Sequence, residues 1–66
     1  MYLLDQPLDR LERDRILRML NGSICRICTS DDCEEIVRML GLSMDYLSML
    51  AYSRAKEVKA ETHENV

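Results

Sequence analysis

The chain has 66 residues and a formal net charge of −3 at pH 7. This length predicts one domain with a small core, and domains of this size usually depend on a disulfide, a metal ion or a second subunit. The negative charge argues against a general attraction to nucleic acid or anionic lipid. No apolar run approaches the roughly 18 residues of a membrane span, and the N-terminus lacks a signal-peptide pattern. We therefore expect a cytoplasmic protein without a membrane partner.

The composition favours helices. Trp and Phe are absent, Gly occurs twice and Pro once, while Leu, Met, Arg, Glu and Ala are frequent and lose little side-chain freedom in a helix. We predict an all-α fold, a small domain of three to four helices over residues 1–60. The polar segment 61–66 is predicted to be a disordered tail.

The first helix is predicted to run from Pro7 to about Leu20. Proline suits a first helical turn, and Asn21-Gly22 is typical of a helix end. The apolar residues of this segment recur at helical spacing and are predicted to form one packed face: Leu8, Leu11, Ile16, Met19 and Leu20.

Two further helices are predicted on either side of Gly41. The second begins near Asp31 and ends at Gly41, with an apolar stripe made of Cys33, Ile36, Val37 and Leu40. The third begins at Ser43 and ends after Lys59. Its predicted packed face consists of Leu47, Leu50, Ala51, Ala55 and Val58.

The segment from Glu35 to Leu50, with Leu40-Gly41-Leu42-Ser43 at its centre and Leu47 beyond, resembles a bacterial helix-turn-helix. It is most similar to region four of sigma factors and to the C-terminal domains of LuxR-type response regulators. The resemblance implies a turn at Gly41 and a small transcriptional regulator that binds DNA as a homodimer. On this interpretation the DNA-binding residues are Arg38, Ser43, Tyr46, Arg54, Lys56 and Lys59.

The start of the third predicted helix supports an alternative function. Bases and phosphates are usually contacted by Arg, Lys, Asn or Gln, whereas Met44, Asp45 and Tyr46 stand there. Methionine and tyrosine are common at protein interfaces. The alternative is a protein-binding helical module that acts on RNA polymerase, a sigma factor or another regulator, with an interface made of Met44, Met49 and Tyr52.

The three cysteines form the pattern Cys25-x2-Cys28-x4-Cys33, which admits three interpretations. They can be small packed residues, they can bind zinc with His63 or an aspartate as a fourth ligand, or they can respond to redox state. The first interpretation predicts no cofactor. No nucleophile has readable catalytic partners, so we expect neither an enzyme nor a small-molecule substrate.

Overall fold

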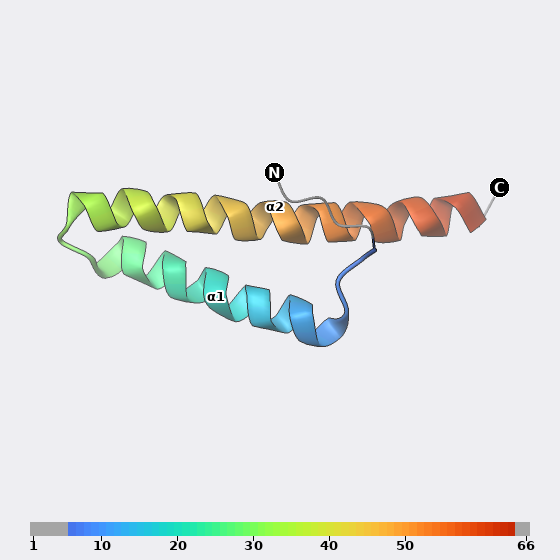
Figure 1. Ribbon diagram of the computed structural model, residues 1–66, viewed down its shortest axis with the longest axis horizontal. Coiled ribbons are helices and arrows are strands. Elements are labelled where there is room, and N and C mark those ends of the chain that lie inside the picture. The colour runs from blue at the N-terminus through green and yellow to red at the C-terminus, as the bar shows by residue number, and fades with distance from the viewer. Residues whose placement is uncertain (1–5, 65–66) are drawn as a thin grey trace.

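The computed structural model describes residues 6–64, and the side chains of residues 6–61. It contains two α-helices, α1 (Arg10–Thr29) and α2 (Cys33–Glu64), which form an antiparallel hairpin (Figure 1). The molecule is elongated, with principal extents of 52 × 21 × 15 Å. The predicted all-α class is confirmed. The prediction of three to four helices is not, because the described residues form two.

Helix α1 begins at a capping aspartate. Asp9 is extended, and its carboxylate accepts a hydrogen bond of 2.8 Å from the backbone N–H of Glu12. This bond satisfies one of the first N–H groups of the helix, which have no partner within it. The predicted start near Pro7 is therefore three residues early.

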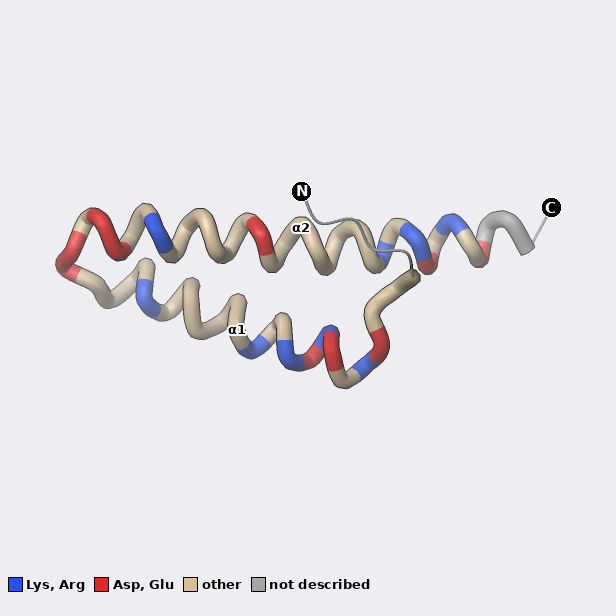
Figure 2. Tube along the Cα trace, in the orientation of Figure 1, with Lys and Arg blue, Asp and Glu red and all other residues tan. Residues whose placement is uncertain are grey.

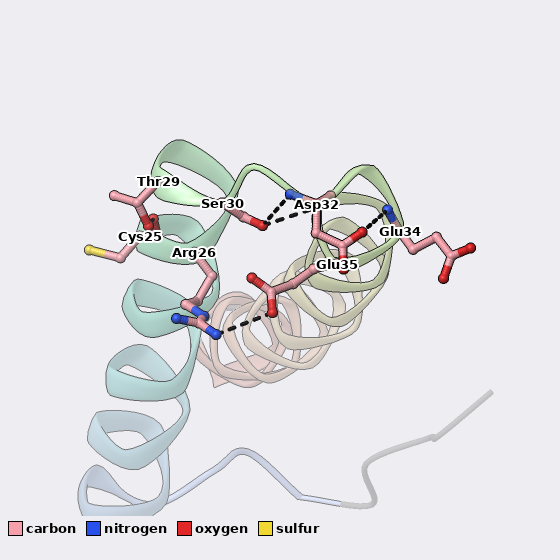
Figure 3. A network of polar contacts seen from close by, with 7 residues as sticks. All are labelled: Cys25, Arg26, Thr29, Ser30, Asp32, Glu34 and Glu35. Atoms are coloured by element: carbon pink, nitrogen blue, oxygen red, sulfur yellow. Dashed lines mark hydrogen bonds and ion pairs between the residues drawn. The ribbon is translucent and has the colours of Figure 1, made fainter.

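The helices are joined by the three residues between Thr29 and Cys33. Ser30 ends α1, with its backbone N–H donating to the carbonyl of Arg26. Its hydroxyl accepts a bond of 3.1 Å from the N–H of Asp32, whose own carboxylate accepts one of 3.0 Å from the N–H of Glu34 (Figure 3). A backbone N–H thus caps the end of α1 and side chains cap the start of α2, which makes a tight reversal possible.

The core lies along one stripe of each helix, with spacings of three and four residues. The stripe of α1 consists of Ile16, Leu20, Ser23 and Ile27, of which the first three are buried. The inner stripe of α2 consists of Ile36, Met39, Ser43, Tyr46, Leu50 and Ser53, all buried or half-buried. This is the heptad pattern by which two helices pack side by side.

Two contacts fix the register of the hairpin. The backbone N–H of Leu8 donates to the hydroxyl of Ser53 over 2.8 Å, and Arg26 forms an ion pair of 3.1 Å with Glu35. In both pairs the residue numbers add to 61. The register therefore places Leu20 opposite Gly41.

Both glycines lie inside helices rather than at helix ends. Gly22 lies within α1 and Gly41 within α2, and neither has a positive φ. The ends predicted at Asn21-Gly22 and at Gly41 are therefore wrong. A helical glycine costs about 1 kcal/mol relative to alanine, which is less than the burial of one large apolar side chain contributes. Because both contact stripes continue past the glycines, packing outweighs this local cost.

Helix α2 continues into the predicted tail. Its last residue is Glu64, so residues 61–64 are helical, while residues 65–66 lie outside the described part of the chain. Over the described residues, no helix combines the length and the apolar character needed to cross a membrane.

Candidate functional site

Helix α2 carries a second apolar stripe that no part of the described chain covers. This outer stripe consists of Val37, Leu40, Met44, Leu47 and Ala51. Each member follows a residue of the inner stripe by one position. The outer stripe therefore has the same heptad spacing as the inner one and lies about 100° from it around the helix axis. Its members are exposed, with 67% of Val37, 59% of Met44 and 53% of Leu47 accessible to solvent.

Helix α1 extends this surface. Leu17 and Ile24 follow residues of its contact stripe by one position, and both are exposed. In an antiparallel pair, positions just after the two contact stripes lie on one side of the hairpin, and positions just before them lie on the other. The ion pair of Arg26 with Glu35 agrees with this geometry, because both residues directly precede stripe positions.

The outer stripe, together with Leu17 and Ile24, lies on one side of the hairpin, which we call the apolar face; on α1 the exposed Asn21 stands between its two members. The register places Ile24 opposite Val37, and Leu17 opposite Met44, so the two helices contribute adjacent side chains. Single exposed leucines are ordinary on protein surfaces, whereas contiguous apolar patches mark interaction sites. The apolar face therefore differs from the single exposed leucines that are ordinary on protein surfaces.

The opposite side of α2 is mixed in character. It carries Arg38, Leu42, Asp45, Met49 and Tyr52 at the positions directly before the inner stripe. Charged residues interrupt the apolar ones here, so no apolar stripe of comparable length forms. The hairpin thus presents two unlike faces, one apolar and one mixed.

The turn end of the hairpin is acidic, whereas at the open end seven cations are nearly balanced by six acids among the described residues. Seven of the nine Lys and Arg residues lie toward the open end, in the first half of α1 and the last part of α2, as Figure 2 shows. They are interspersed with acids, and Arg54 is paired with Glu57 over 2.9 Å and with Glu61 over 3.9 Å. The turn end instead carries four acids within five residues, at Asp31, Asp32, Glu34 and Glu35.

The residues predicted to bind DNA do not form one surface. Arg38, Arg54 and Lys59 are exposed, whereas Lys56 is half-buried. Ser43 is buried in the inner stripe, where its hydroxyl donates to the carbonyl of Met39 over 2.8 Å. Tyr46 is half-buried in the same stripe.

The residues predicted to form a protein interface divide between the two faces. Met44 belongs to the outer stripe and is exposed. Met49 and Tyr52 lie on the opposite, mixed side of α2, and Met49 is half-buried. Of the packed face predicted for the third helix, Leu50 is half-buried and Leu47, Ala51, Ala55 and Val58 are exposed. That predicted packed face is therefore wrong for all but Leu50.

The three cysteines lie near the turn, all exposed and all free. Figure 3 shows the side chain of Cys25 pointing away from α2. Among the described residues, no group of three His, Cys, Asp or Glu side chains is arranged to hold a metal ion. The side chain of His63, the predicted fourth zinc ligand, lies outside the described residues. The prediction that the cysteines are packed residues is therefore wrong for this hairpin, in which all three are exposed.

The apolar face as a whole was missed by reading the sequence, although its signal was present. Val37 and Leu40 were assigned to one predicted helix, and Leu47 and Ala51 to the next. Their spacing of three and four residues continues without a break across Gly41. An unbroken heptad pattern would have predicted one long helix with two apolar stripes.

Comparison with known proteins adds no family to these observations: no family model matches the chain, and neither the curated proteins nor the solved structures include a significant match.

Proposed function

We propose that this chain is a protein-binding helical module that acts through its apolar face and has no catalytic activity. The observation that carries the proposal is the outer stripe of α2, whose five members are exposed over four helical turns. Burying one such leucine or valine contributes about 1.5–3 kcal/mol. A helix or helical pair laid along the stripe would gain several such contributions. The target is another protein of the transcription apparatus or a second copy of the chain.

The cytoplasm is the proposed location. Three exposed free thiols support it, because reducing compartments keep such groups from forming disulfides.

The proposal is tested by photo-crosslinking in cells that make the protein. A benzoylphenylalanine at Leu47 is expected to give a discrete protein adduct, and the same probe at Asp45, on the mixed face, is expected to give none. Adding Leu40→Asp should abolish the adduct, because a charge then interrupts the apolar face. An absence of adduct at Leu47, or an adduct digested by nuclease, would refute the protein-binding function.

A second candidate function is DNA binding as a helix-turn-helix regulator. It is favoured by the concentration of Arg and Lys toward the open end, whereas α2 continues through Gly41, where the resemblance implied a turn. The contributing cations would be Arg38, Arg54, Lys56 and Lys59. Such binding would weaken steeply with salt, because it releases counterions from phosphates. Gel shifts with genomic fragments at low salt test it, and no retardation at high micromolar protein would exclude it.

A further inference from the structure

We infer that the partner covering the apolar face is a second copy of this chain, with the two α2 helices packed antiparallel along their outer stripes. The inference rests on the proposed protein-binding function and specifies its partner and orientation. Its basis is the ability of the outer stripe to pair with a copy of itself, combined with the concentration of acids at the turn end.

The hairpin alone has little core. Its buried apolar side chains, over the described residues, are Ile16 and Leu20, and the other buried positions of the contact stripes are serines. At equivalent positions the outer stripe carries as many large apolar side chains as the inner one, and its members are exposed rather than packed. A chain of this size gains most from covering that stripe, and a second copy supplies an identical surface.

The outer stripe is complementary to itself when two copies run in opposite directions. In antiparallel helices, alternating heptad positions pair with each other across the interface. One register places Leu40 of one copy opposite Ala51 of the other, and Met44 opposite Leu47. Each layer then combines a large residue with a smaller or flexible one, as close packing favours.

The charges select this orientation over the parallel one. A parallel dimer would bring the acid-rich turn ends of both copies together, with Asp31, Asp32, Glu34 and Glu35 of each beside those of the other. The antiparallel dimer separates the two acidic turn ends and brings each toward the open end of the other copy, where Lys59 is exposed and acids and bases are nearly balanced. Like charges repel over about 10 Å at ordinary ionic strength, so the repulsion between turn ends sets the direction while apolar burial supplies the affinity.

Sedimentation equilibrium of the full chain under reducing conditions tests association. The wild type is expected to be a dimer at micromolar concentration. Leu47→Asp should weaken the dimer at least about a hundredfold, because an unpaired charge enters the centre of the interface twice. Ser48→Asp is the matched control, since it adds the same charge one residue away on the outer surface of α2 and should leave the dimer intact. Circular dichroism establishes that both variants stay helical.

Disulfide trapping tests the orientation. In a chain with all three cysteines changed to serine, Leu40→Cys and Ala51→Cys variants are mixed and oxidised. The antiparallel dimer predicts a disulfide between the two variants and little within either, because like positions lie 11 residues apart, about 16 Å along the helix. A parallel dimer would instead link each variant to itself.

The outcomes separate this inference from the proposed function. A wild type that sediments as a monomer at high micromolar concentration would overturn the homodimer. If Leu47 then still crosslinked to a different protein in cells, the protein-binding function would stand. If neither association nor crosslinking occurred, both would fall.

Discussion

Three serines occupy buried positions in the contact stripes of this hairpin. Ser23, Ser43 and Ser53 are the buried polar residues among those described, and each occupies a stripe where a larger apolar residue would be usual. A small side chain lets two helix backbones approach closely, but its hydroxyl needs a partner once buried. Ser43 donates back to Met39 within its own helix, whereas Ser53 accepts from the backbone of Leu8. Ser53 therefore links the segment before α1 to α2.

Replacing Ser53 by alanine is expected to lower the free energy of unfolding by about 1 kcal/mol, because the N–H of Leu8 loses its acceptor in a partly buried setting. Ser48→Ala, at an exposed position of the same helix, should change it by less than about 0.5 kcal/mol. Chemical denaturation at one fixed protein concentration measures both. Equal stabilities would show that the bond to Leu8 does not contribute.

The cysteines allow a second prediction at this scale. Because all three are exposed, a maleimide should modify three thiols per native chain and leave the helical circular dichroism unchanged. Metal analysis of protein prepared with zinc is expected to find far less than one zinc per chain. Stoichiometric zinc that slows alkylation and is lost with the fold on chelation would instead establish a metal-binding function.

At the scale of the element, the glycines explain which parts of the fold could be predicted. Helical composition could be predicted, but of the packed face predicted for the first helix only Ile16 and Leu20 are buried, whereas Leu11 and Met19 are exposed. The helix boundaries could not be predicted, because Asn21-Gly22 and Gly41 have the local chemistry of helix ends. What outweighs the local preference for a helix end is the packing of α1 against α2. That packing joins residues far apart in the sequence. The site was missed for the same reason, since a helix divided at Gly41 has no continuous outer stripe.

Gly41→Ala distinguishes a helix from a turn. A methyl group at Gly41 would meet no atom within 4 Å, and φ is not positive there. In a continuous helix the change should raise the free energy of unfolding by about 1 kcal/mol. A helix-turn-helix whose turn requires a positive φ at this residue would be destabilised instead. Thermal denaturation gives the sign, and Gly22→Ala in α1, where a methyl group also meets nothing, should behave in the same way.

On the scale of the whole molecule, stability depends on few buried side chains. Leu20→Ala is expected to cost about 2–5 kcal/mol, which is a large part of the total stability of a domain this small. The two helices should be lost together, because each depends on the other for its contact stripe. Leu11→Ala, at a side chain that is 77% exposed, should be nearly neutral. Two separate unfolding transitions in the Leu20 variant would show that the helices are stable independently.

The unequal lengths of the helices have a consequence for exchange of backbone amide hydrogens with solvent. The register places Leu8 opposite Ser53, so the part of α2 beyond Ser53 extends past the start of α1 (Figure 1). Amides from Ile36 to Leu50 become exchangeable only when the hairpin opens, whereas those beyond Arg54 need only local fraying. Mass spectrometry after brief exposure of the Leu47→Asp variant, which is expected to be monomeric, to deuterated buffer should find a step in protection near Ser53. Equal protection of all α2 amides against exchange would show that a part of the protein other than α1, or a second molecule, covers the last turns of α2.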